Sequence, residues 1–221
     1  MRPQNKNSTI WSSNLAYAIG LITTDGNLSK DNRHISLTSK DKEQIENFKL
    51  CLGLTNKIGR KARGGELEKK YYLLQFGDVH FYQFLKSIGL KPNKSKILSD
   101  LKIPKKYFFD FLRGHFDGDG TSYSYWDKRW RSSFMFYTVF ISASKNHILW
   151  LKRTIEKNIK IKGHLTKSVN SSTYHLKYAK TESLKLLPEI YYNKDLICLT
   201  RKRLKIEEVL LKNSVKSARV L

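Results

Sequence analysis

The chain has 221 residues, 40% of them hydrophobic and 12% aromatic, which excludes an intrinsically disordered protein and allows a sizeable core. Lysine and arginine number 42 against 19 acidic residues, a formal net charge of +23. Such an excess on a folded chain is typical of a nucleic-acid binder. A basic membrane-surface or ribosome-associated protein is the alternative.

Cys51 and Cys198 show no Cys-x-x-Cys spacing, so a zinc site is not expected and a reducing compartment is the simplest interpretation. The apolar runs are shorter than a membrane-spanning helix requires, and residues 1–14 lack the apolar core of a signal peptide. These features predict a soluble intracellular protein without a membrane partner. A bacterial or archaeal cytoplasm and an organelle matrix both fit this prediction.

The first half of the chain predicts an alternation of helices and strands. Apolar residues at helical spacing indicate a helix through residues 14–25, which Asn14 is expected to cap. Residues 33–54 follow as an alternating strand, a Ser-Lys pair and an amphipathic helix. Two strand-like runs and a short helix complete this half: residues 56–64, 69–77 and 79–89.

The second half repeats this pattern. In the segment YFFDFLRGHFDGDGT, Gly114 takes the place of Gly20, and Asp119 takes the place of Asp25, 94 residues earlier. The later segments match in the same order: residues 137–155, 161–169, 172–180 and 181–191. The sequence therefore predicts an α+β protein of two αββαββα repeats, residues 1–104 and 105–221, related by a pseudo-twofold axis.

Gly20 and Gly114 are expected to face each other across that axis, because two related helices approach closely only where small residues meet. A glycine inside a helix costs roughly 1 kcal/mol relative to alanine, and close packing would offset this cost. The same contact would bring the helix ends together. Asp25 and Asp119 are therefore expected to lie near each other.

Two neighbouring carboxylates repel each other, and a hard divalent cation such as Mg²⁺ relieves the repulsion. In a basic protein the expected anionic substrate is the phosphodiester backbone, which a metal-activated water can hydrolyse. Lys40 and Lys145 fall at the same place in the two repeats, after a predicted strand. They are the predicted catalytic lysines, which would stabilise developing negative charge.

The segments AIGLITTDG, residues 18–26, and LRGHFDGDG, residues 112–120, resemble the two copies of the LAGLIDADG motif of homing endonucleases. The segments GLKPNKSKI and YYNKDLICLTRKRLKI, which begin at residues 89 and 191, also resemble family sequence. In the first motif Thr23 replaces the earlier acid of the family pattern.

The resemblance implies a monomeric, single-chain endonuclease with a two-helix interface and two four-stranded antiparallel sheets in the major groove of double-stranded DNA. It implies cleavage of both strands across the minor groove with short 3′ overhangs. Asp25 and Asp119 are the implied metal ligands, with Thr24 and Gly118 just before them. Asp117, the earlier acid of the second motif, is not expected to be catalytic. Lys40 and Lys145 resemble the basic residues that flank the metals in the family.

If the sheets lie in the major groove, their hairpin tips should carry the DNA contacts. The predicted contacts are Lys30, Asn32, Arg33, Arg60, Arg63, Lys128, Arg129, Arg131, Lys167 and Asn170. Trp126 and Trp130 are expected to pack beneath the hairpin that carries them. That hairpin is predicted to be the longer one, because 26 residues separate Asp119 from Lys145 but only 15 separate Asp25 from Lys40.

An RNA maturase and a DNA-binding regulator of the same fold remain alternatives to the endonuclease. Loss of an active-site acid would favour them, and neither acid is lost. An intein-embedded enzyme is disfavoured because no splicing-domain sequence flanks the motifs. A host intron or a free-standing gene is the favoured context.

Overall fold

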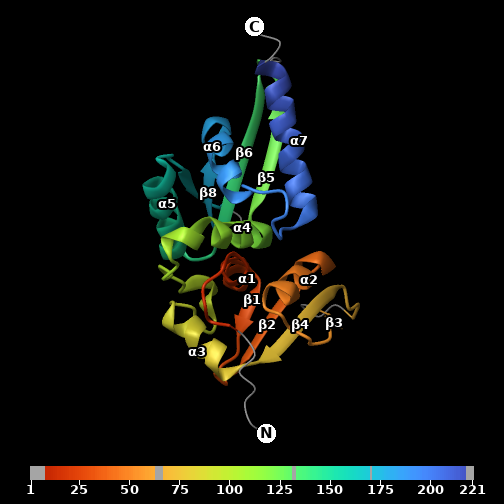
Figure 1. Ribbon diagram of the computed structural model, residues 1–221. Coiled ribbons are helices and arrows are strands. Elements are labelled where there is room, and N and C mark those ends of the chain that lie inside the picture. The colour runs from red at the N-terminus through yellow and green to blue at the C-terminus, as the bar shows by residue number, and fades with distance from the viewer. Residues whose placement is uncertain (1–7, 63–66, 131–132, 170, 218–221) are drawn as a thin grey trace.

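Two helices cross the centre of the molecule, α1 (Ser13–Thr24) below and α4 (Phe108–Asp119) above (Figure 1). The computed structural model describes residues 8–62, 67–130, 133–169 and 171–217. The first half of the chain lies on one side of the helix pair and the second half lies on the other. Ser12, rather than the expected Asn14, caps α1, and its hydroxyl accepts a hydrogen bond from the Leu15 amide at 3.1 Å.

The first half continues from α1 as an antiparallel four-stranded sheet with two helices. The strands are β1 (Gly26–Leu28), β2 (His34–Ser39), β3 (Gly59–Lys61) and β4 (Tyr71–Gly77), and the helices are α2 (Lys42–Cys51) and α3 (Val79–Ser87). The strand order is β1-β2-β4-β3. The second half begins after two short 3-10 turns, η1 (Lys94–Lys96) and η2 (Lys105–Tyr107).

The second half follows α4 with the same topology. The strands are β5 (Thr121–Trp126), β6 (Phe134–Ser142), β7 (His164–Lys167) and β8 (Tyr174–Tyr178), and the helices are α5 (Lys145–Ile159) and α6 (Lys180–Ile190). The order β5-β6-β8-β7 repeats that of the first sheet. Both halves are therefore αββαββα units, which confirms the fold class predicted from the sequence. The exact division at residues 104 and 105 stays a prediction.

Each sheet has one face covered by helices and one face that is open. In β6 the residues alternate, so Phe134 and Phe136 point into the core while Met135 and Tyr137 point to the other face. Helices α5 and α6 contact the second sheet, as α2 and α3 contact the first. The open faces are the surfaces available to a large ligand.

The hairpin β5–β6 is longer than its counterpart β1–β2, as the spacing predicted. Six residue pairs join β5 to β6, from Thr121 opposite Val139 to Trp126 opposite Phe134, whereas three join β1 to β2. Trp126 contacts Phe134 at 5.1 Å between ring centroids and remains 51% exposed. Trp130 is 71% exposed, so the expectation that it packs beneath the hairpin is wrong.

A long helix at the C-terminal end, α7 (Thr200–Ser217), has no equivalent in the repeat and was not predicted (Figure 1). It lies beside β5, where Ile206 and Val209 join the core. Among the residues that the structure describes, no helix has the length and apolarity needed to cross a bilayer. Both cysteine thiols are free.

Candidate active site and nucleic-acid interface

Gly20 of α1 and Gly114 of α4 lie against each other at the helix crossing. A Cβ atom on Gly20 would lie 2.6 Å from the amide nitrogen of His115, closer than real Cβ contacts come. A Cβ on Gly114 would lie 2.9 Å from the carbonyl carbon of Tyr17, with its oxygen nearer still. The two backbones are therefore in direct contact, and only glycine fits at either position.

This close contact brings the ends of both helices to one cavity. Asp25 is the C-cap of α1, Asp119 is the last residue of α4, and both line a cavity of about 550 Å³. The first sheet also contributes Asn27 and Thr38 to the wall, and the second contributes Ile141. Asp25 and Asp119, which the sequence predicted to lie near each other, therefore line the same cavity.

Gln44 of α2 holds the carboxylate of Asp25. Its amide nitrogen donates to Asp25 Oδ2 at 2.7 Å, while its amide oxygen accepts a hydrogen bond from the Ser39 hydroxyl at 3.0 Å. Gln44 is not among the residues predicted from the sequence. Its place three residues after the N-cap of a helix is unremarkable in sequence.

Two lysines, the buried Lys94 and the half-buried Lys202, bond to the backbone next to the acids and were not predicted from the sequence. Lys94, from the segment between the halves, donates to the carbonyl oxygen of Gly26, which follows Asp25. Lys202, from α7, donates to the carbonyl oxygen of Gly120 at 2.6 Å, the residue that follows Asp119. The two lysines therefore occupy equivalent places in the two halves.

Lys202 also closes the last turn of α4. Its ammonium donates to the carbonyl oxygens of Phe116 at 2.7 Å, Asp117 at 2.8 Å and Gly118 at 3.1 Å. The Phe116 carbonyl also accepts a hydrogen bond from the Gly120 amide at 2.9 Å. A cation at a helix C-terminus is favoured by the helix dipole. Lys202 thereby fixes the backbone that carries Asp119.

Burial lowers the pKa of Lys94 to about 8, although Asp25 and Asp119 act in the opposite direction. Burial likewise lowers the pKa of Lys202 to about 8, opposed mainly by the carboxylate of Asp117. Both ammonium groups are therefore charged at neutral pH but close to the range in which a proton can be given up.

The structure does not bring the predicted lysines, Lys40 and Lys145, into the cavity wall. Lys40 is exposed, and its ammonium lies 5.3 Å from the centre of the Tyr71 ring. Lys145 is the exposed first residue of α5. The caps of α2 and α5, Asp41 and Ser144, make Lys42 the true counterpart of Lys145. The sequence comparison had paired Lys145 with Lys40, two residues before Lys42, because the loops before α2 and α5 both contain serine and lysine.

Asp117 is fully buried and takes a structural role, in agreement with the expectation that it is not catalytic. It accepts hydrogen bonds from the hydroxyl groups of Tyr17 at 2.8 Å and Tyr191 at 3.1 Å. The amide of Leu199 donates to it at 2.7 Å. Burial raises the pKa of this carboxyl, and these donors oppose the effect. Asp117 thus joins α1, α4 and the segment before α7.

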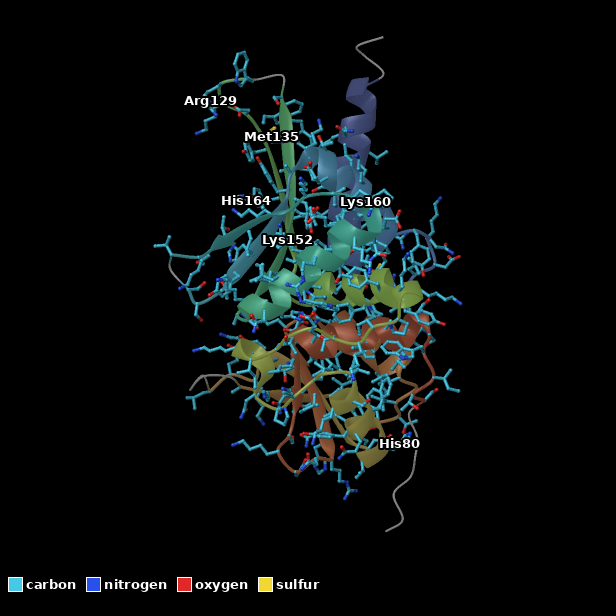
Figure 2. The ribbon with its side chains drawn as sticks, turned by 90° about the vertical axis from the view of Figure 1, so that its left-hand side faces the viewer. His80, Arg129, Met135, Lys152, Lys160 and His164 are labelled. Atoms are coloured by element: carbon cyan, nitrogen blue, oxygen red, sulfur yellow. The ribbon has the colours of Figure 1, made fainter. Side chains whose placement is uncertain are left out.

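Most of the predicted DNA contacts that the structure describes are exposed at loop tips. Lys30, Asn32 and Arg33 lie in the β1–β2 turn, and Lys128 and Arg129 lie at the β5–β6 tip, where Figure 2 labels Arg129.

Two further predicted contacts lie on strands. Lys167 is exposed at the end of β7. Arg60 lies 4.3 Å from the centre of the Tyr72 ring, on the helix side of the sheet, and its neighbour Lys61 lines the cavity instead. Arg63, Arg131 and Asn170 lie outside the described residues.

The sequence profile of the LAGLIDADG-like domain matches residues 12–89, which lie in the first half of the chain. The second half repeats the sheet topology of the first. No curated protein sequence matches the chain.

Solved structures show the same fold over most of the chain. The I-LtrWI LAGLIDADG homing endonuclease bound to target DNA matches with a TM-score of 0.60 and 12% identity, over 93% of this chain and 91% of that one. I-DmoI in complex with DNA and Mn matches with a TM-score of 0.53 and 15% identity, over 82% and 97%. The N-terminal LAGLIDADG domain of DUF199/WhiA matches with a TM-score of 0.56 and 14% identity, over 94% and 92%.

Proposed function

We propose that the protein is a site-specific DNA endonuclease that cuts both strands of a long duplex with a divalent cation. One arrangement carries the proposal: Asp25 and Asp119 line one cavity, and Lys94 and Lys202 donate to the carbonyl oxygens of the residues that follow them. The net charge of +23 provides the attraction for a polyanion. DNA-bound relatives of the same fold support the choice of partner.

The donor set suits a hard cation such as Mg²⁺. The two carboxylates lie at helix C-termini, whose partial negative charge also favours a cation. Within the described part of the chain, no cluster of three His, Cys, Asp or Glu side chains could hold a metal. Mg²⁺ commonly binds through one or two carboxylates and completes its shell with water and substrate phosphate.

The backbone offers two further oxygens, those of Thr24 and Gly118, as predicted ligands. The Gly118 carbonyl already accepts a hydrogen bond from Lys202, which leaves it one lone pair. A divalent cation would polarise the scissile phosphate and lower the pKa of a water nucleophile.

The protein's own groups then have separable tasks. Gln44 orients the Asp25 carboxylate through its amide. Lys94 lines the cavity and presents a buried positive charge where negative charge grows on the phosphate, and it can give a proton to a departing oxygen. Lys202 donates to backbone carbonyls and acts by holding the end of α4 that carries Asp119. Because each lysine bonds to the residue after a different aspartate, each is assigned chiefly to one strand.

The test is cleavage of a random duplex library followed by sequencing of the new ends. Recurrent double-strand ends are expected with Mg²⁺ and none with EDTA. Asp25→Asn and Asp119→Asn should each stop double-strand cleavage while keeping duplex binding, because losing a negative charge does not weaken attraction to phosphate. Asp100→Asn, at an exposed carboxylate that pairs with Arg153 and is not part of the cavity lining, is the matched control and should cut normally. Cleavage in EDTA, or by either site variant, would contradict the proposal.

A second candidate is a protein of this fold that binds nucleic acid without cutting it, as a regulator or an RNA maturase. The similarity to the LAGLIDADG domain of WhiA covers as much of the chain as the similarity to the endonucleases, so the fold alone does not separate the two. Sequence-selective binding without any cleavage in Mg²⁺ would favour this candidate.

A further inference from the structure

The open face of the β5–β6 hairpin carries three stacked tyrosines. The ring of Tyr137 lies 5.1 Å from that of Tyr123 at an interplanar angle of 22°, and 6.2 Å from that of Tyr125 at 15°. Tyr123 and Tyr125 are exposed at 38% and 45%, and Met135 lies opposite Tyr125 on the same face. We call these four residues the tyrosine ladder. Figure 2 labels Met135 on this hairpin.

The first sheet offers different chemistry at its open face. There Asn27 lies opposite Ser36, and Ser36 lies opposite Gln75. These side chains present donors and acceptors that suit any base edge. The two halves, alike in topology, are therefore unlike in the groups they offer to a bound molecule.

The tyrosine ladder offers mainly ring edges and a thioether. The neighbouring Tyr125 side chain raises the pKa of Tyr137, which keeps the Tyr137 hydroxyl neutral. Positive charge surrounds it, with Lys128 and Arg129 at the hairpin tip and Lys177 opposite Val139 on the same face. An apolar strip edged by cations fits a duplex groove, where phosphates flank the bases.

In the major groove only one base offers an apolar group, the C5 methyl of thymine. We propose that the tyrosine ladder reads thymine methyl groups, so the half-site bound by the second half is selected for thymine, or for 5-methylcytosine, at the ladder positions. This inference rests on the proposed binding of duplex DNA. Burying one methyl group should change Kd by about fourfold.

The experiment separates the methyl group from the rest of the base. Duplexes that bind the protein are selected from a random library in EDTA, which prevents cutting. In the selected duplex each thymine is then replaced singly by uracil, and Kd is measured by fluorescence anisotropy. Uracil should weaken binding about fourfold at one to three positions in one half-site, and 5-methylcytosine should restore more affinity there than cytosine does.

Variants of the tyrosine ladder test whether it causes the preference for thymine at those base positions. Tyr123→Ser and Tyr125→Ser should bind the thymine and uracil duplexes equally. Trp126→Ser is the matched control, because Trp126 is a similarly exposed aromatic on the opposite face of β5 and should keep the preference. Thermal unfolding of each variant verifies the fold.

The outcomes distinguish this inference from the proposed function. If duplexes are enriched but uracil has no effect, or if the tyrosine variants lose affinity for both duplexes alike, the ladder is scaffold and the inference fails. If no duplex is enriched, the proposed function itself fails.

Discussion

The contact between Gly20 and Gly114 gives a prediction that links packing to catalysis. In Gly114→Ala the new methyl would meet the Tyr17 carbonyl, a backbone group that no rotamer change can move aside. Ordinary van der Waals contact begins at about 3.4 Å. The helices must therefore separate by roughly 1 Å, and overpacking of this kind costs about 1–3 kcal/mol.

Alanine recovers about 1 kcal/mol of helix propensity, so a net loss of roughly 1 kcal/mol remains. For a chain of this length that corresponds to a fall in Tm of about 2–4 °C. The same separation moves Asp25 relative to Asp119, and a displacement of about 1 Å commonly slows catalysis about a hundredfold. Duplex binding should change far less, since the open sheet faces are outside the helix contact.

Calorimetry and single-turnover cleavage provide the two measurements. Gly59→Ala is the control, because the nearest atom to its new Cβ would be 3.8 Å away, and its Tm should stay close to that of the wild type. The double variant at Gly20 and Gly114 should lose less than the sum of the single losses, because the first methyl already opens the interface. A Gly114→Ala protein with unchanged Tm and full cleavage would refute the packing argument.

Three further outcomes follow from the site. Lys94→Met and Lys202→Met should each slow cleavage about a hundredfold, with unequal effects on the two strands in a strand-resolved gel. Lys40→Met should cut normally. If Lys40→Met cuts slowly while Lys94→Met and Lys202→Met cut normally, Lys40 is the catalytic lysine. Asp117→Asn replaces one carboxylate oxygen with an NH2 group, so at least one of the existing donors loses its acceptor, and urea unfolding should show a loss of about 1–3 kcal/mol. Burial lowers the pKa of His147 from 6.5 to about 4. Between these pH values only the unfolded state is protonated at this residue, so it lowers stability by about 1.4 kcal/mol per pH unit on acidification. His147→Gln should have a shallower urea-unfolding profile from pH 6.5 to 5, and an unchanged slope would contradict its neutral burial.

The sequence by itself determined the features that depend on local sequence patterns and that recur in both halves of the chain. Hydrophobic periodicity and the repeated Gly and Asp positions were enough to predict two αββαββα halves. They were also enough to predict the helix contact at Gly20 and the shared site of Asp25 and Asp119. The longer β5–β6 hairpin followed from counting residues. Each of these depends on neighbours within a few residues, or on a comparison of one half with the other.

Only the tertiary structure decided which lysines bond to the backbone next to Asp25 and Asp119. Lys94 lies 68 residues from Gly26 in the chain, and Lys202 lies 82 residues from Gly120. Both lie in segments that resemble family sequence, but among 42 lysines and arginines nothing in those segments gives these two a role, because a lysine in a loop or on a helix is usually solvated. Lys94 and Lys202 reach these positions when the segment between the halves and α7 fold back onto the ends of the central helices. No periodic pattern in the sequence predicts that contact.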